Sequence, residues 1–219
     1  DCIAWGDIRN CINQLVTKPD IGSLLFEYRF QNSGELNNHN LGNLMLLALE
    51  NLCVRPLDAV NLIRDMLHVK CNLIPMSEAP SDLIAITPCG SDVYGEVSVD
   101  KMAQFPEEML LKPQVPATEE AISAITQADT IILGPGSFLT SIVPPLLLKE
   151  IKRALTRTSA KVIYFSNLRE ELSAASTVSL EQRLNWLEAK LGTQCIDAVI
   201  QDHQHQFPIS YPSYCYDLR

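Results

Sequence analysis

The chain has 219 residues, of which 47% are hydrophobic and 20% charged, so it can bury one sizeable core and is too apolar to be disordered throughout. Its formal net charge of -9, without a Lys/Arg-rich run, argues against nucleic acid or an anionic membrane surface as the main partner. No apolar run approaches the ~20 residues of a membrane span, and no signal-peptide pattern opens the chain. Seven scattered cysteines without a Cys-x-x-Cys pair indicate reduced thiols, so we expect a cytoplasmic protein.

Apolar residues at helical spacing predict a helical first third. The first helix is expected to begin with Asp7 as its N-cap. Three further helices are predicted over residues 21–28, 43–53 and 56–67, the last with a proline in its first turn. Residues 31–40, rich in Asn, Gly and Ser, are predicted to be a loop.

The middle of the chain carries short β-like stretches interrupted by Pro and Gly. These predicted strands cover residues 71–76, 83–87 and 94–99. The Pro-rich segment 105–116 is typical of a linker. We therefore expect a small strand-rich region before the second half of the chain.

From residue 117 onward, predicted helices and strands alternate. Thr118 is expected to cap a helix, and helices over 146–155 and 180–191 separate strands at 130–133, 162–165 and 198–200. This alternation predicts an α/β fold with a mostly parallel sheet covered on both faces. We expect one domain over 1–219, with residues 201–219 as a tail of uncertain structure because they show no clear periodicity.

The strand at 130–133 stops at a glycine-rich turn followed by hydroxyl residues. Glycines permit positive φ and close approach of a ligand, and unpaired amides at a strand-to-helix turn can hold a phosphate. The same pattern also fits a tight structural turn whose hydroxyl caps the next helix. If the turn binds a ligand, the binding residues are Gly134, Pro135, Gly136, Ser137, Thr140 and Ser141.

A second polar cluster lies around the start of the first helix. Arg9 can bind a phosphate with two hydrogen bonds, with Asn10 beside it, and Asp7 can orient a hydroxyl or hold a divalent ion. The alternative is a capping aspartate beside a surface arginine. Asp7 is thus a candidate catalytic residue and a candidate Mg²⁺ ligand.

Two more places gather polar side chains suited to ligand contacts. His39, Asn40 and Asn43 precede or open an apolar helix, where they can contact a phosphate or base or form an Asn-rich turn with a cap. Asn167 follows the 162–165 strand at the edge where open parallel sheets bind ligands, although asparagine also simply terminates strands. No Ser-His-Asp order or activated cysteine stands out, so nucleophilic hydrolysis is not expected.

Four motifs, in this order, resemble the CofD-like family, also called the 2-phospho-L-lactate transferase family. They are Gly6–Asn10, Phe26–Phe30, His39–Leu44 and Leu133–Ile142. The resemblance runs from about residue 3 to residue 200. It is closest to the bacterial YvcK-like branch, whose members are called "putative gluconeogenesis factor".

This resemblance implies a Rossmann-like three-layer α/β/α fold with a nucleotide site at the carboxyl edge of the sheet. Branch members look like binders of nucleotides, UDP-sugars or NAD-like dinucleotides that influence cell shape and growth on gluconeogenic carbon sources. The transferase members instead use Mg²⁺ to join a lactyl phosphate, carried on guanosine diphosphate, to a deazaflavin alcohol. The resemblance therefore implies a phosphorylated small-molecule ligand, and it leaves room for a homodimer and for a magnesium-dependent phosphotransferase.

The chain also departs from the family pattern. The family's amino-terminal strand and its Gly-Gly-x-Gly loop have no counterpart in this sequence, so we expect part of the family's site to be missing. Residues 167–171 differ from the Thr-Gln-Pro-Gly-Glu run of many bacterial relatives, and the tail after residue 200 does not resemble theirs.

Overall fold

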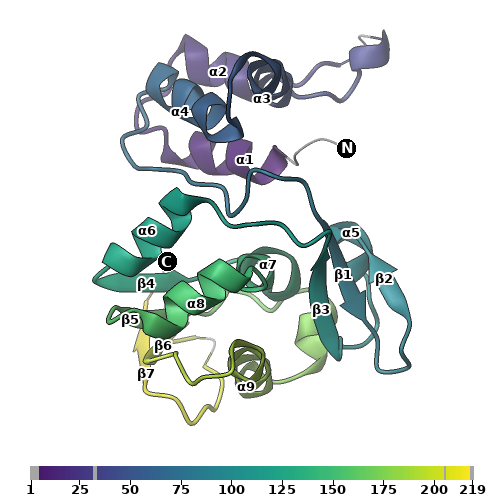
Figure 1. The fold of residues 1–219 in the computed structure, drawn as a ribbon, viewed down its shortest axis with the longest axis vertical. Coiled ribbons are helices and arrows are strands. Elements are labelled where there is room, and N and C mark those ends of the chain that lie inside the picture. Colours follow the sequence, from purple (N-terminus) through teal and green to yellow (C-terminus); the bar gives the residue numbers. More distant parts are fainter. Residues whose placement is uncertain (1–4, 32–33, 205, 218–219) are drawn as a thin grey trace. The chain divides into compact units, whose positions relative to one another are not determined.

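The computed structural model describes residues 5–31, 34–204 and 206–217. It divides into two compact units, Asp1–Pro80 and Ser81–Arg219, which are drawn in Figure 1. Each unit is described by itself below. The single domain expected over 1–219 stays a prediction.

The first unit is helical, as predicted. Its helices are α1 (Gly6–Leu15), α2 (Ile21–Glu27), α3 (Leu41–Leu52) and α4 (Pro56–Met66), with a short 3₁₀ turn η1 (Gly34–Leu36) in the expected loop. Local signals explain the starts: the Asp20 carboxylate accepts from the Ser23 amide at 2.9 Å, and Pro56 occupies the first turn of α4. The strand predicted at 71–76 is wrong, because this segment has no regular structure.

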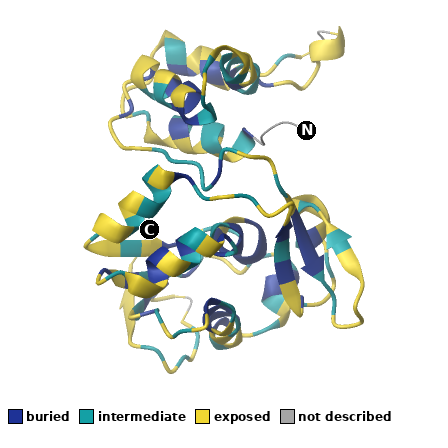
Figure 2. Ribbon diagram, viewed as in Figure 1, coloured by how far each residue is buried: buried dark blue, intermediate teal, exposed yellow. Residues whose placement is uncertain are grey.

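The core of the first unit is built from apolar side chains of all four helices, and the buried positions appear dark blue in Figure 2. Gly42 sets how closely α3 approaches α2. A Cβ atom at this position would stand 2.5 Å from the Phe26 carbonyl oxygen. The core residues that are at most 1% exposed are Ile12, Phe26, Leu46, Ala59, Val60 and Ile63.

The second unit begins with a three-stranded antiparallel sheet in the order β2-β1-β3. Its strands are β1 (Asp82–Ile86), β2 (Asp92–Tyr94) and β3 (Glu108–Lys112). The prediction for 83–87 is confirmed, but the strand predicted at 94–99 is wrong. Gly95 adopts φ +80° and helix α5 (Glu96–Asp100) follows it. The linker predicted at 105–116 is also wrong, since it contains β3 with Met109 and Leu111 buried.

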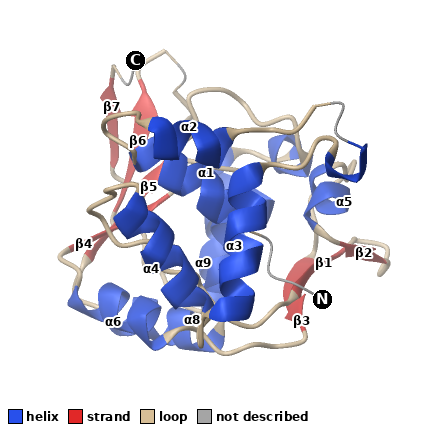
Figure 3. Ribbon diagram, turned by 90° about the horizontal axis from the view of Figure 1, so that it is seen from above, coloured by secondary structure: helices blue, strands red, loops and turns tan. Residues whose placement is uncertain are grey.

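A four-stranded parallel sheet forms the rest of the second unit, in the order β4-β5-β6-β7. Figure 3 shows its strands in red among the helices. Its strands are β4 (Thr130–Leu133), β5 (Lys161–Phe165), β6 (Ala198–Asp202) and β7 (Ser213–Tyr216). The helical segments that follow or precede these strands are α6 (Glu119–Gln127), the π-helical turn η2 (Phe138–Ile142), α7 (Val143–Leu146), α8 (Lys149–Arg157), the 3₁₀ turn η3 (Ala174–Thr177) and α9 (Leu180–Leu191). The predicted α/β fold with a mostly parallel sheet is confirmed.

Thr118 caps α6 as predicted, with its hydroxyl accepting from the Ala121 amide at 3.3 Å. The tail, in contrast, is more regular than expected. Residues 213–216 form β7, which pairs parallel with β6 from Val199↔Ser213 to Asp202↔Tyr216. The side chain of Gln201 is 1% exposed and accepts from the Phe207 amide at 2.7 Å, so it fixes the connection to the last strand.

Parallel strands end at one edge of their sheet, and this places several polar residues together. Gly134 follows β4, Ser166 and Asn167 follow β5, Asp202 ends β6, and Asp217 follows β7. This carboxyl edge is the part of the second unit from which the candidate site is built. No helix in the described part of the chain is long and apolar enough to span a bilayer.

Candidate functional site

The turn after β4 has a backbone that only glycine tolerates at its first position. Gly134 adopts φ +89°, and a Cβ atom there would lie 2.9 Å from the Phe165 carbonyl oxygen at the end of β5. Gly136 adopts φ +154°. The two glycines therefore let the turn lie tightly against the neighbouring strand.

Asn167, which follows β5, forms two hydrogen bonds with this turn. Its side-chain oxygen accepts from the Gly136 amide at 2.9 Å, and its side-chain nitrogen donates to the Gly136 carbonyl at 2.9 Å. The structure thus brings together two parts of the predicted site that lie 31 residues apart. Asn167 reaches the glycine turn rather than merely terminating its strand.

The expectation of outward, unpaired amides in this turn is wrong for two of them. The Gly136 amide binds Asn167, and the Phe138 amide donates to the Glu171 carboxylate at 3.0 Å. A carboxylate oxygen is an anionic acceptor of the kind that a phosphate would offer. In this structure an acidic side chain of the chain itself thus fills an anion position of the turn.

Glu171 is the centre of a small buried network. Its carboxylate also accepts from Asn167 at 3.0 Å and from the Ser173 hydroxyl at 3.1 Å, and it lies 3.5 Å from the Arg183 guanidinium. The side chains of Glu171 and Arg183 are each 9% exposed. Burial raises the pKa of the adjacent Tyr164 to about 12, with the Arg183 charge lowering and the Glu171 charge raising that pKa.

The hydroxyl residues of the turn face a second carboxylate. Ser137 donates to Asp100 at 3.1 Å, and Thr140 donates to the same carboxylate at 3.1 Å. Ser137 makes no side-chain capping bond to η2, so the capping alternative does not hold for it. Ser141 and Pro135 are both exposed.

Sequence reasoning missed Asp100, Glu171 and Arg183. Asp100 comes from α5, 37 residues before Ser137, and nothing in its local spacing points to the turn. Arg183 lies within α9, where the apolar period predicts only a helix. Glu171 had a signal, because it is the one position of residues 167–171 that agrees with the Thr-Gln-Pro-Gly-Glu pattern quoted above.

In the first unit, the predicted residues at the start of α1 lie on one helical turn. Asp7 is exposed within the first turn, so its prediction as the N-cap is wrong: α1 begins at Gly6, and its N-cap is Trp5, two residues before Asp7. The Trp5 indole donates to Glu50 at 2.7 Å, which ties the start of α1 to α3. Arg9 donates to the side chain of its neighbour Asn10.

In the His39–Asn43 cluster, one side chain caps a helix, and other polar groups are exposed or lack a hydrogen-bond partner. Asn40 is 3% exposed, caps α3 by accepting from the Asn43 amide at 3.2 Å, and donates to the Glu27 carbonyl at 3.0 Å. Its role is that of a cap, as in the alternative reading. His39 is exposed. Among the described residues, the buried Arg9 Nε and Asn43 Oδ1 atoms find no hydrogen-bond partner.

Comparison with known proteins supplies a family for this geometry. A family model described as "2-phospho-L-lactate transferase CofD" matches residues 1–214, which extends past residue 200, where the resemblance was expected to stop. The chain is 58% identical over 204 residues to the "Putative gluconeogenesis factor" of Vibrio cholerae, covering 93% of this chain and 69% of that protein. It is 31% identical over 201 residues to the "Gluconeogenesis factor" of Listeria innocua, covering 91% of this chain and 62% of that protein.

A solved structure shares the fold. The crystal structure of a member of the UPF0052 family from Bacillus halodurans matches with a TM-score of 0.84 and 28% sequence identity, covering 94% of this chain and 66% of that chain. The chain therefore spans roughly two thirds of the length of these relatives. On the match of the family model and of these relatives, the chain belongs to the CofD family.

Proposed function

We propose that this chain binds a nucleotide or nucleotide sugar as a regulatory protein of the gluconeogenesis-factor type, influencing cell shape and growth on gluconeogenic carbon sources. The observation that carries the proposal is the glycine turn after β4, held by Asn167 at the carboxyl edge of a parallel sheet. Open parallel sheets bind ligands at this edge. The names of the Vibrio and Listeria relatives support the part of the proposal that concerns growth on gluconeogenic carbon sources.

The acidic groups at the turn shape how an anionic ligand would bind. Glu171 holds the Phe138 amide, so a phosphate oxygen would take the place of one carboxylate oxygen there. The Arg183 guanidinium, 3.5 Å from Glu171, would keep the displaced carboxylate compensated. Binding is therefore an exchange of one anionic acceptor for another.

The first unit offers a second set of polar groups, a donor on Arg9 and an acceptor on Asn43. Buried polar atoms are usually hydrogen-bonded, and among the described residues of this unit Arg9 Nε, Asn43 Oδ1 and Arg64 Nε lack a partner, so each is a group that a ligand or water could satisfy. Asn10 and His39 are exposed. We propose that these residues contact a polar group of a ligand bound to the first unit.

The proposal includes a cytoplasmic location and a phosphorylated small molecule as the ligand. Six described cysteines, at 11, 53, 71, 89, 195 and 215, are free thiols, in keeping with a reducing compartment.

Calorimetric titration tests the proposal. The protein is titrated with UDP-N-acetylglucosamine, guanosine diphosphate and NAD, each with and without Mg²⁺. We expect saturable binding of one of these, weakened about tenfold or more in Arg9→Ala and unchanged in Arg153→Ala, which removes an exposed arginine of α8. Absence of binding by all three at about 1 mM would contradict the proposal.

A magnesium-dependent phosphotransferase is the second candidate, favoured by the description of the matching family model. Asp7 would then hold Mg²⁺ or orient the acceptor hydroxyl, since it is an exposed carboxylate on the same helix as Arg9. The Asp7→Asn variant should lose magnesium-dependent transfer from a guanosine diphosphate carrier while its circular dichroism stays unchanged. Equal turnover in the variant would remove Asp7 from that role.

A further inference from the structure

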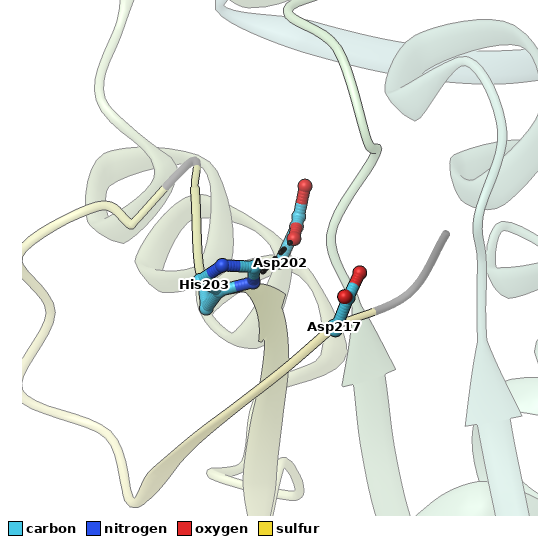
Figure 4. Close-up of side chains that lie close together, drawn as sticks. All are labelled: Asp202, His203 and Asp217. Carbon is cyan, nitrogen blue, oxygen red and sulfur yellow. Dashed lines mark ion pairs between the residues drawn. The ribbon is translucent and has the colours of Figure 1, made fainter.

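Three potential metal ligands meet at the far end of the same sheet edge. Asp202 ends β6, His203 follows it, and Asp217 follows β7, and Figure 4 shows their side chains side by side. Each residue offers one ligand atom, and these atoms all lie within 4.8 Å of one another. His203 Nδ1 lies 3.3 Å from Asp202 Oδ1.

The β6–β7 ladder holds the backbone that carries these side chains. Asp202 is the register partner of Tyr216, and the His203 amide donates to the Tyr216 carbonyl at 3.0 Å. His203 and Asp217 thus follow a paired position on two adjacent strands. A cluster set by strand register is far more preorganised than one formed by loop side chains that meet by chance.

Burial distinguishes this cluster from a group of surface acids. Asp202 is 0% exposed, whereas His203 and Asp217 are exposed. Asp202 accepts from the Gln204 amide at 3.4 Å and lies 3.3 Å from His203 Nδ1. A cation held between the buried carboxylate and the two outer ligands would add a positive charge beside it and would keep coordination positions open toward solvent.

The donor set indicates the kind of ion. Mg²⁺ and Ca²⁺ prefer oxygen ligands alone, whereas an imidazole nitrogen suits divalent ions of the first transition row. We propose that Asp202, His203 and Asp217 form a binding site for such an ion, with Mn²⁺ or Zn²⁺ as representative occupants.

The proposed metal site lies on the same sheet edge as the glycine turn. β6 lies two strands from β4, and neighbouring strands are spaced about 4.8 Å apart, so the ion would sit about 10 Å along the edge from the glycine turn. A cation at that distance would favour an anionic ligand extending along the edge. The metal site itself stands on the cluster alone and does not depend on the proposed function.

Mn²⁺ is the best probe, because the described cysteines can bind Zn²⁺ through their sulfur atoms. The protein, treated with chelator, is titrated with Mn²⁺ and Mg²⁺, and binding is followed by calorimetry and by the electron paramagnetic resonance signal of free Mn²⁺. We expect one Mn²⁺ per chain, bound at least about tenfold more tightly than Mg²⁺.

Two variants at the exposed ligands separate the contributions and keep the buried Asp202 side chain itself unchanged. In His203→Gln the preference for Mn²⁺ over Mg²⁺ should disappear, because the nitrogen ligand is gone. In Asp217→Asn the affinity for both ions should fall about tenfold or more. The matched controls His68→Gln and Asp92→Asn, at exposed positions elsewhere, should bind both ions as the unchanged protein does.

Three results would overturn the proposal. One is the absence of stoichiometric Mn²⁺ binding at about 1 mM by the folded protein. The others are wild-type affinity in both His203→Gln and Asp217→Asn, and equal losses in the control variants. Circular dichroism of every variant shows that a loss of binding does not come from unfolding.

Discussion

Asn167 and Gly136 exchange two hydrogen bonds of 2.9 Å, one to each polar group of the Gly136 peptide backbone. One side chain at the end of β5 thereby fixes the turn at the end of β4. Asn167→Ala should lower the free energy of unfolding by about 1–3 kcal/mol, because the amide and the carbonyl of Gly136 both lose a partner. Urea unfolding measures the change.

Asn167→Asp tests the same pair more finely. An aspartate can still accept from the Gly136 amide but cannot donate to its carbonyl, and its charge lies beside Glu171. We expect a loss of stability comparable to that of the alanine variant. Arg169→Ala, an exposed position of the same segment, serves as the control. If Asn167→Ala and Asn167→Asp unfold at the same urea concentration as the unchanged protein, as the control should, Asn167 does not hold the turn.

Gly42 in α3 is required by packing. An added Cβ would stand 2.5 Å from the Phe26 carbonyl oxygen and 2.8 Å from its ring, so Gly42→Ala should destabilise the protein by about 2–3 kcal/mol despite the better helix propensity of alanine. Gly6→Ala is the matched control in α1, where nothing lies within 4 Å. It should change stability by less than about 1 kcal/mol. Equal unfolding midpoints by circular dichroism would contradict this view of Gly42.

Segments with a strong local signal were predicted well. Helix α9 has the bounds that were predicted, and the structure shows local signals at both ends: Ser179 begins a capping box, and Gly192 follows the helix in the left-handed conformation. Helix α4 was predicted to within one residue from Pro56 and its apolar face. The rule that ligands bind at the carboxyl edge also pointed to Asn167, which the structure places against the glycine turn; its contact with a ligand stays a prediction.

Where the local signal was weak or the contact was distant, prediction failed. In residues 94–99 the β-branched Val97 and Val99 favour a strand, but tertiary packing buries Val99 in a short helix after Gly95. Strand β7 has four exposed residues and forms by pairing with β6, which no periodicity reveals. Asp100 and Glu171 reach the glycine turn from 37 and 33 residues away, and such contacts are a property of the fold.

Removing one partner of the Glu171–Arg183 pair should strongly lower the free energy of unfolding. Both side chains are 9% exposed, and Arg183→Met would leave the Glu171 carboxylate buried without its cation. Removing one partner of a buried pair costs about 3–5 kcal/mol. Glu171→Gln should cost less, because the amide oxygen can still accept from Phe138.

A double-mutant cycle on this pair makes the prediction sharp. If the two charges interact, the double variant Glu171→Gln, Arg183→Met should be more stable than the sum of the single losses predicts. Glu170→Gln, an exposed neighbour, is the control and should change stability little. Additive losses from urea unfolding would show that the two residues act independently.

Because the pKa of Tyr164 is raised in the folded protein, we expect the protein to lose stability at alkaline pH. Burial raises its pKa to about 12 in the folded protein, whereas the phenol of an unfolded chain ionises near 10. Unfolding is then favoured by release of the proton, so stability is fully present below pH 10 and falls as the pH rises toward 12. Two pH units correspond to about 2.7 kcal/mol for this group.

The variant Tyr164→Phe isolates that contribution. Urea unfolding at several pH values between 9 and 11.5 should show a shallower fall in stability for the variant than for the unchanged protein. Other groups that ionise in this range, including Cys195 with its pKa raised by burial to about 11, are common to both proteins and cancel in the difference. Parallel pH profiles would contradict the assigned pKa.

Ser166 lies at the end of β5 and is 5% exposed, and its hydroxyl oxygen has no hydrogen-bond partner among the described residues. A buried hydroxyl without a partner costs about 1–3 kcal/mol, so Ser166→Ala should leave the free energy of unfolding unchanged or raise it by about 1 kcal/mol.

If the hydroxyl of Ser166 instead binds a ligand at the carboxyl edge, the same variant should bind that ligand more weakly while remaining as stable. Thermal unfolding with and without nucleotide distinguishes the two contributions, because ligand stabilisation adds to intrinsic stability only in proportion to affinity. A large loss of stability without ligand would show that the hydroxyl is satisfied within the protein, by water or by a rearranged neighbour, and that position 166 is structural.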